Sequence, residues 1–214
     1  MLRLIVRLWL PDRPGALGRV ASALGSVGAS LVAIDILEQE QGWAIDELVV
    51  EAVDSPNAIE KLVAALRMVE GVNVEDIRAS TGDDIDPRVD ALETAAELVE
   101  QSNSSSLMQI LVNRAAHDLS ADWGAIVEID SDHLLVATGD VPSGAWIRAF
   151  VAGSRSSDAL SGGQGGPDDI AWAELVKAQA VLVVGRERRP FRQRERRQLA
   201  PLARIADRRL AELP

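Results

Sequence analysis

The spacing of hydrophobic residues changes within the first thirty positions, and the change separates two kinds of element. Residues 3–10 alternate between apolar and other side chains, which predicts a strand with one buried face. Apolar residues then recur every three or four positions between Leu17 and Val27, which predicts a helix that ends at Gly28. We expect Pro14 in the first turn of this helix, where its missing N–H removes a donor that is unpaired anyway. The inward strand positions are Leu4, Val6, Leu8 and Leu10.

The pattern continues with two strands, a helix and a final strand up to residue 80. Residues 30–40 and 44–53 alternate on either side of a turn at Gln41-Gly42, and they predict a hairpin. Residues 58–70 have helical spacing, and residues 72–79 form a last strand. The order strand, helix, strand, strand, helix, strand is the ferredoxin-like arrangement. On the second strand, Val32, Ile34 and Ile36 are expected to face the core, and Leu31, Ala33, Asp35 and Leu37 to face away.

The sheet face turned away from the two helices is expected to be strongly apolar. So much apolar surface is unfavourable in water, so we expect either a second copy of the chain or the C-terminal half to cover it. The apolar residues predicted on this face are Ile5, Trp9, Leu31, Ala33 and Leu37.

A polar stretch at residues 81–87 predicts a linker to a second region. Its first helix, over residues 88–100, has Val89, Leu92, Ala96 and Val99 at the 3,4,3 spacing that suits contact with another helix. The glycine- and serine-rich stretch 153–166 is expected to be mobile. The remaining elements are predicted as a helix over 107–120, a hairpin over 123–129 and 134–138, a short helix over 146–151, strands over 170–175 and 180–186, and a helix to residue 213 that is kinked or restarted at Pro201.

Composition narrows the range of functions. The chain has 214 residues, no cysteine and a formal net charge of −11. The missing cysteines exclude disulfides, a thiolate nucleophile and Cys-bound zinc. The negative charge argues against general affinity for nucleic acid. Because no run of 18 apolar residues and no signal-peptide pattern occur, we expect a cytoplasmic protein that does not associate with a membrane.

The loop between the first strand and the first helix carries the clearest binding chemistry. The N–H groups of Gly15, Ala16 and Leu17 are expected at the positive end of a helix dipole, and they predict a binding site for a carboxylate. The ammonium of an α-amino acid would then pair with Asp12 or Asp35. A helix-terminus contact contributes about 0.3–2 kcal/mol, so a second chain is expected to complete the site. In an alternative interpretation, Asp12 caps the helix with no ligand present.

The sequence Asp12-Arg13-Pro14-Gly15-Ala16-Leu17, within this order of strands and helices, resembles the ACT domain over residues 1–80. The resemblance implies a regulatory module that binds an amino acid at an interface between two copies. Many ligand-binding members have an asparagine at the start of the second strand, where this chain has the shorter Ser30. The candidate ligand-binding residues are therefore Asp12, Arg13, Pro14, Gly15, Ala16, Leu17, Ser30 and Asp35.

Residues 88–214 resemble a GAF domain in two places. The helix over 107–119 leads into Trp123-Gly124-Ala125-Ile126-Val127, which is similar to the start of such a domain. The strand over 181–186 leads through Pro190-Phe191 into a helix, which is similar to its end. GAF domains are sensor modules, and various members bind cyclic nucleotides, tetrapyrroles or small metabolites. This chain has neither a chromophore cysteine nor the residue cluster associated with cyclic nucleotides, so the resemblance implies a sensor or dimerisation domain without a specified ligand.

The segment from Arg186 to Arg209 holds ten arginines and three acidic residues. An arginine-rich helix can contact nucleic acid. The same helix also carries an apolar stripe, and no aromatic residues alternate with the arginines for base stacking. We therefore expect these arginines on a solvated face or paired with Glu93, Glu97 and Glu100, and we do not expect a nucleic-acid partner.

Catalytic and metal sites are not indicated. The two histidines, His117 and His133, fall in different elements, and neither a nucleophile elbow nor a His-Glu-x-x-His pair occurs. The run Gly162-Gly163-Gln164-Gly165-Gly166 lacks the Gly-Lys-Ser/Thr of a phosphate-binding loop. We expect a protein that is not an enzyme and that needs neither a metal nor another cofactor.

Together these features predict an α+β protein with a ferredoxin-like ACT domain at residues 1–80, a linker at 81–87 and a small GAF-like α/β/α domain at 88–214. The expected function is a regulatory sensor that binds an amino acid at a homodimer interface and signals by changing its dimer arrangement or its partner contacts. Two alternatives stay open, a structural interaction module with no ligand and a sensor whose ligand binds the GAF-like domain. The sequence does not specify a further protein partner.

Overall fold

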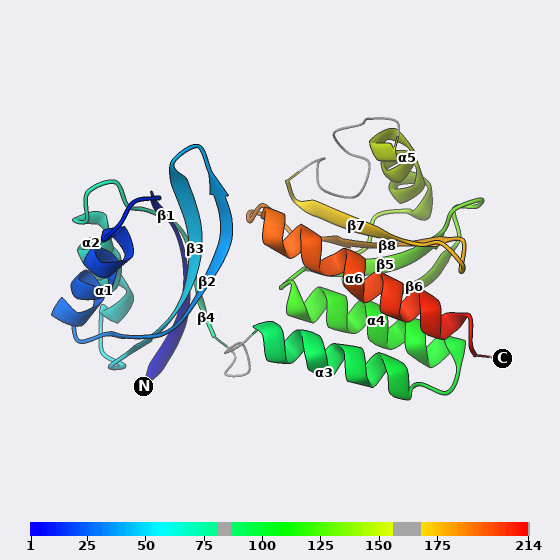
Figure 1. Cartoon of the computed structure of the whole chain (residues 1–214), viewed down its shortest axis with the longest axis horizontal. Helices are drawn as coiled ribbons and strands as arrows, with labels where there is room; N and C mark the ends of the chain where they lie inside the picture. Colours follow the sequence, from blue (N-terminus) through cyan, green and yellow to red (C-terminus); the bar gives the residue numbers. More distant parts are fainter. Residues whose placement is uncertain (81–86, 156–167, 214) are drawn as a thin grey trace. The chain divides into compact units, whose positions relative to one another are not determined.

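The computed structural model describes residues 1–80, 87–155 and 168–213, and the chain divides into two compact units, Met1–Asp86 and Pro87–Pro214 (Figure 1). Most of the predicted linker and most of the glycine- and serine-rich stretch lie outside the described residues. Within the described ranges, no helix combines the length and the apolar character needed to cross a membrane.

The first unit is a four-stranded antiparallel sheet with two helices on one face (Figure 1). Its elements are β1 (Leu2–Pro11), α1 (Ala16–Ser26), β2 (Ser30–Glu40), β3 (Trp43–Ala52), α2 (Ala58–Arg67) and β4 (Asn73–Ala79). The strands lie in the order β2-β3-β1-β4, so β3 and β1 are central and β2 and β4 are the edges. This order confirms the predicted ferredoxin-like arrangement of mixed helices and strands.

The core of the first unit lies between this sheet and its two helices. Every second residue of β1 from Leu4 to Leu10 is buried on the helix side, as the alternation predicts. Residues three or four positions apart on α1 and α2 fill the other side, because that spacing places them on one helix face. The buried helix residues are Ala16, Val20, Leu24, Leu62 and Leu66.

Two β-bulges change which residues of β2 face the helices. The pairing of β2 with β3 skips one residue at Val32 and another at Leu37. Leu31 lies opposite Val50 and packs in the helix-side core, so its predicted outward orientation is wrong. A bulge inserts one unpaired residue and so reverses the alternation along the strand, which the spacing of apolar residues did not reveal.

Charged side chains cross the face of the sheet that lies away from the helices. Glu47 accepts hydrogen bonds from Arg7 Nη2 at 2.9 Å and from Arg78 Nη1 at 3.1 Å. Burial raises the pKa of Glu47, but the two guanidinium groups outweigh burial and hold the pKa below its ordinary value. Nearer the start of β1, Arg3 donates from Nε to Glu51 at 3.0 Å. This face therefore combines apolar residues with ion pairs, and Arg7 is only 1% exposed.

The second unit is also built on a four-stranded antiparallel sheet, and helices cover both of its faces (Figure 1). Its elements are α3 (Pro87–Glu100), α4 (Ser104–Asp118), β5 (Trp123–Glu128), β6 (Leu134–Thr138), α5 (Gly144–Arg155), β7 (Ile170–Leu175), β8 (Ala180–Gly185) and α6 (Gln193–Leu210). The strands lie in the order β6-β5-β8-β7. α3, α4 and α6 lie on one face and α5 lies on the other, so the sheet separates two cores.

Three helices of the second unit differ from the prediction. α4 begins at Ser104, three residues earlier than expected, because Asn103 caps it by accepting a hydrogen bond from the Ser106 N–H at 2.8 Å. α5 spans Gly144–Arg155 and is twice as long as the predicted six residues. α6 continues as one helix through Pro201, so the proline does not end or restart it.

One buried arginine joins several segments of the second unit. Arg186 follows β8 and is 2% exposed. Its guanidinium donates hydrogen bonds to three carbonyl oxygens, those of Leu119 (2.6 Å), Arg189 (2.8 Å) and Pro190 (2.8 Å). It also donates to Glu195 Oε2 in the first turn of α6 at 2.8 Å. Arg186 therefore ties the end of β8 to the residue after α4 and to the start of α6.

Candidate functional site

The loop before α1 is a tight turn that ends at the first residue of the helix. The Ala16 N–H donates to the Arg13 carbonyl oxygen at 3.2 Å, and Gly15 has φ 84° and ψ −7°. A four-residue turn with proline second and a left-handed glycine third has the features of a type II turn. α1 therefore begins at Ala16, and Pro14 precedes the helix instead of lying in its first turn.

Two further expectations for this loop are wrong for the same reason. The Ala16 N–H is not available to a ligand, because it closes the turn. Asp12 does not cap α1, since Gly15 is the N-cap residue. The Asp12 N–H instead donates to the Gly42 carbonyl oxygen at 2.8 Å. The side-chain Oδ1 of Asp12 accepts a hydrogen bond from Gln39 Nε2 at 3.4 Å. The remaining N–H groups of the first turn are the candidate donors to an anion.

Arginine side chains lie beside the start of α1. Arg13 lies within the turn, and its Nη2 is 3.9 Å from the exposed carboxylate of Glu70. Arg19 lies one turn into the helix, and its Nη1 is 3.7 Å from the position that a Cβ on Gly15 would take. Two cations near the positive end of a helix favour an anionic group at this place.

A buried carboxylate lies on the helix side of the same sheet. Asp46 on β3 is 3% exposed, and its Oδ1 has no hydrogen-bond partner within the described residues. Burial and, to a smaller extent, the negative charge of Asp12 raise the pKa of Asp46 from its ordinary 3.8 to about 6. The sequence analysis missed this residue. The sequence signal for a buried carboxylate was the place of Asp46 at an inward position of the strand, between the inward residues Ala44 and Leu48.

Ser30 and Asp35 lie away from the loop of the same chain. Ser30 pairs with Glu51, and Glu51 pairs with Arg3, at the end of the sheet where β1 begins. The loop follows the other end of β1, about 26 Å further along the strand. Asp35 lies opposite Glu47 near the middle of β2, on the face away from the helices. One chain therefore does not bring the candidate residues together.

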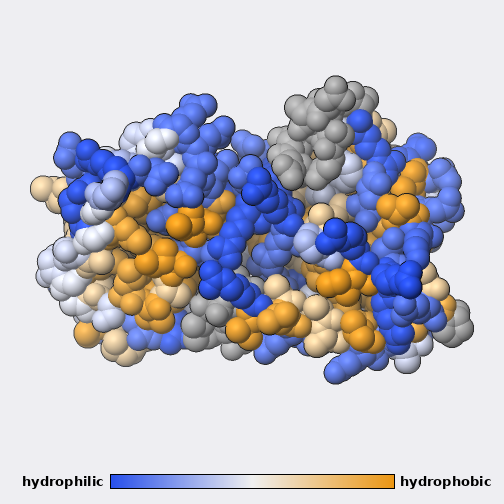
Figure 2. All heavy atoms as spheres, in the orientation of Figure 1, coloured by the Kyte–Doolittle hydropathy of each residue, from blue (hydrophilic) through white to orange (hydrophobic). Residues whose placement is uncertain are grey.

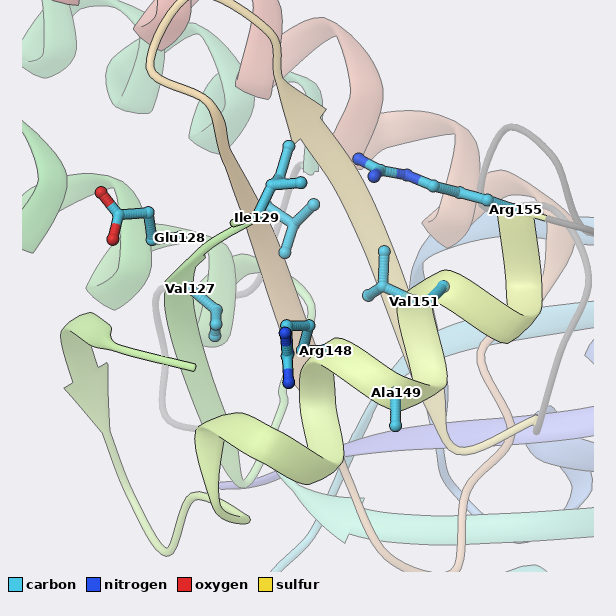
Figure 3. Close-up of a pocket in the computed structure, with 9 residues that line it drawn as sticks. Val127, Glu128, Ile129, Arg148, Ala149, Val151 and Arg155 are labelled. Atoms are coloured by element: carbon cyan, nitrogen blue, oxygen red, sulfur yellow. The ribbon is translucent and has the colours of Figure 1, made fainter. Parts of the chain in front are cut away.

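A second candidate site is a cavity of about 300 Å³ between α5 and the sheet of the second unit (Figure 3). Val127 and Ile129 line it from the sheet side, and Val151 lines it from α5. Arg148 and Arg155 also come from α5, and their spacing of seven residues places them on one face of the helix. The cavity therefore has an apolar wall, and its charged lining residues are Arg148, Arg155 and Glu128.

The two arginines of this cavity have different surroundings. Arg148 is exposed. Arg155 Nε lies 2.9 Å from Glu174 Oε1, and its guanidinium lies 6.0 Å from the centre of the Trp172 ring. The sequence analysis missed this site because the helix predicted over 146–151 ended before Arg155.

The arginines of residues 186–209 are partly built into the second unit. Arg186 and Arg196 are 2% and 7% exposed, and Arg196 Nη1 donates to the Ile170 carbonyl oxygen at 2.6 Å. Glu97, one of the three acids offered as partners of this segment, accepts a hydrogen bond from Arg114 Nε on α4 at 2.7 Å. Among the residues described, no group of three or more His, Asp or Glu side chains could hold a metal ion.

Comparison with known proteins identifies an ACT domain in the first unit. The family model of the ACT domain matches residues 4–67, which confirms the predicted resemblance for this part of the chain and suggests a regulatory role in binding a small molecule. The GAF-like character of the second unit stays a prediction. No curated protein matches the chain.

Two solved structures are similar to parts of this chain. The uncharacterized protein TM1266 from Thermotoga maritima is 22% identical, with 36% of this chain and 95% of that chain covered and a TM-score of 0.28. An unknown protein from Galdieria sulphuraria is 11% identical, with 62% of this chain and 75% of that chain covered and a TM-score of 0.31.

Proposed function

We propose that this protein is a non-enzymatic regulatory sensor in which two ACT domains bind an amino acid at sites between them. The observation that carries the proposal is the type II turn of residues 13–16, which leads directly into α1 within the region matched to the ACT domain. The turn residues Arg13, Pro14 and Gly15 are exposed. The helix N-terminus suits the carboxylate of the ligand, and Asp12 suits its ammonium.

The edge strand β2 is the surface through which we expect two copies to pair. Among the described strands, β2 has only β3 as a neighbour in its sheet. It exposes Val32 (42%), Ile34 (38%) and Ile36 (46%). A long apolar edge favours pairing with another chain. Ser30 and the loop lie at opposite ends of the domain, so an antiparallel pairing of two β2 strands about a two-fold axis would bring Ser30 of each copy toward the loop of the other.

Isothermal titration of the chain with each of the twenty amino acids tests the proposal. We expect heat from one or two of them, with dissociation constants of roughly 10 μM to 1 mM, about −7 to −4 kcal/mol. Gly15→Leu should abolish this heat, because a side chain at φ 84° strains the turn and covers the N–H groups at the helix start. No heat of binding with any of the twenty amino acids would favour a structural interaction module that has no ligand.

A mixing control separates a two-chain site from a site within one chain. Gly15→Leu and Ser30→Ala are each expected to weaken binding when present in every copy. In a mixed dimer of the two variants, one site has both changes and the other has an intact loop and an intact serine. Mixing should therefore restore binding at one of the two sites. No recovery, with both variants folded and dimeric, would contradict a site shared between copies.

A second candidate function is a ligand site in the second unit, favoured by the cavity between α5 and the sheet. Its apolar wall and the arginines at positions 148 and 155 suit an anionic molecule with an apolar body. This candidate is the alternative in which the second unit, and not the ACT domain, senses the ligand.

Fluorescence of 1-anilino-8-naphthalenesulfonate, an apolar anion, tests the cavity. We expect saturable binding under native conditions, and we expect Arg148→Ala to weaken it by roughly tenfold through the loss of one charge contact. Ala152→Trp should abolish it, because Ala152 is exposed and lines the cavity, so a larger side chain fills the space without disturbing the core. Arg197→Ala, an exposed arginine on α6, is the matched control. Equal effects of Arg148→Ala and Arg197→Ala would argue against the cavity.

A further inference from the structure

α3 has two apolar faces, and the second unit covers only one of them. The covered face carries Thr94 and Leu98, both 0% exposed, and Thr94 Oγ1 donates to Asp118 Oδ2 on α4 at 2.7 Å. The other face carries four exposed apolar residues, which we call the outer stripe. They are Val89 (48%), Leu92 (72%), Ala96 and Val99 (56%). Figure 2 shows hydrophobic surface where Figure 1 places α3.

The outer stripe has the spacing of a two-stranded coiled coil. Its residues are three, four and three positions apart, which places them at a, d, a and d of a heptad repeat. Val89 at a and Leu92 at d form the combination that, in parallel coiled coils, favours two strands, and the second heptad has Ala96 at a and Val99 at d. Thr94 and Leu98 then fall at f and c, on the opposite side of the helix. The outer stripe can therefore contact a partner while α3 stays packed on α4.

Charges beside the outer stripe select both the partner and the orientation. Arg88 lies at position g, and Glu93 and Glu100 lie at position e. In a parallel pair, a g residue lies beside the e residue five positions further along the other helix, so Arg88 of one copy meets Glu93 of its partner. In an antiparallel pair, e residues meet e residues, so the two glutamates would repel each other. The same helix of a second copy thus supplies the complementary charge.

We propose that α3 pairs in parallel with α3 of a second copy of this chain through the outer stripe. The helix has 14 residues, which span about 21 Å. Two helices of this length form a short contact, so the pairing adds to other contacts between copies instead of holding the dimer alone. The inference concerns the second unit and does not depend on an amino-acid ligand.

Cysteine cross-linking without any added ligand tests the pairing. The chain has no cysteine, so a single introduced thiol reports on one position. Parallel pairing brings residue 89 close to its counterpart, so Val89→Cys and Val99→Cys should each give a disulfide-linked dimer under mild oxidation. Met68→Cys, at an exposed position of the first unit (86%), is the control and should not cross-link.

Antiparallel pairing would separate the two copies of residue 89 by about 15 Å along the helix. In that case neither single variant would cross-link, and only a mixture of Val89→Cys and Val99→Cys would do so, which would overturn the proposal. If neither single variant nor their mixture cross-links, the proposal is overturned as well. Cross-linking with no heat from any amino acid would support this pairing and reject only the sensor.

A charge exchange checks the orientation in a second way. Arg88→Glu in the Val89→Cys background should slow cross-linking by roughly tenfold, since each dimer then has two repulsive pairs. Adding Glu93→Arg should restore the rate, because the exchange rebuilds the complementary pairs. These residues lie on the surface of α3, so neither change should disturb the fold. A double variant no faster than Arg88→Glu would contradict the proposed register.

Discussion

Arg186→Met is expected to lower the free energy of unfolding of the second unit by about 3–5 kcal/mol. The buried guanidinium donates to the carbonyl oxygens of Leu119, Arg189 and Pro190 and to Glu195. A methionine fills part of the space but donates no hydrogen bond. Replacing Arg186 therefore leaves three carbonyl groups and a largely buried carboxylate without this donor. Buried polar groups are costly to leave unsatisfied.

Urea unfolding followed by circular dichroism and tryptophan fluorescence measures this loss. Trp123 is a suitable reporter because its ring lies against Gly185, the residue before Arg186. Arg197→Met, at an exposed position of α6, is the matched control and should change stability by less than about 0.5 kcal/mol. Arg186→Lys should fall between the two, since it keeps the charge but loses the planar fork of donors. A loss below 1 kcal/mol for Arg186→Met would show that the hydrogen bonds contribute little.

Asp46→Asn is expected to have the opposite effect and to stabilise the first unit by about 1–3 kcal/mol at pH 8. The carboxylate is buried, and its pKa is raised to about 6. At pH 8 the folded protein must therefore hold a charge that the unfolded chain exposes to water. Asparagine has nearly the same shape and no charge, so this cost disappears.

The pH dependence gives the sign of the effect. A carboxyl group with a raised pKa binds its proton more tightly in the folded state, so the stability of the natural protein falls as pH rises from about 4 to about 6. The advantage of Asp46→Asn should accordingly be small at pH 4 and complete above pH 7. Thermal unfolding of both proteins across this range measures it, with the exposed Asp54→Asn as control. If the stabilisation by Asp46→Asn does not change with pH, burial of an ionised Asp46 does not lower the stability of the natural protein.

The order of elements in the first unit could be predicted because its strands and helices have strong periodicity. The alternation in β1 and the helical spacing in α1 both describe faces that are buried in one core. The prediction failed at β2, where the bulges at Val32 and Leu37 shift the alternation. It also failed at Pro14, because a proline before a glycine suits both a helix start and a type II turn.

The candidate site was harder to predict than the fold. The loop residues could be proposed from the sequence because they are contiguous and their backbone chemistry is local. Ser30 lies at the far end of the same sheet, so the proposed contact with the loop would need a second copy, whose position one sequence does not describe. Asp46 could have been found from its inward position. The cavity beside α5 depends on the length of that helix, and its last turn was not predicted.

The bulge at Val32 has a consequence for length variation in β2. Leu31 and Ala33 pair with adjacent residues of β3, Val50 and Val49, so the residue between them has no place in the ladder. A chain lacking this one residue could keep every other partner and every orientation. A deletion at position 34 that keeps this bulge would instead turn Asp35 and Ile36 to the opposite faces of the sheet. A single-residue deletion should therefore cost less stability at position 32 than at position 34.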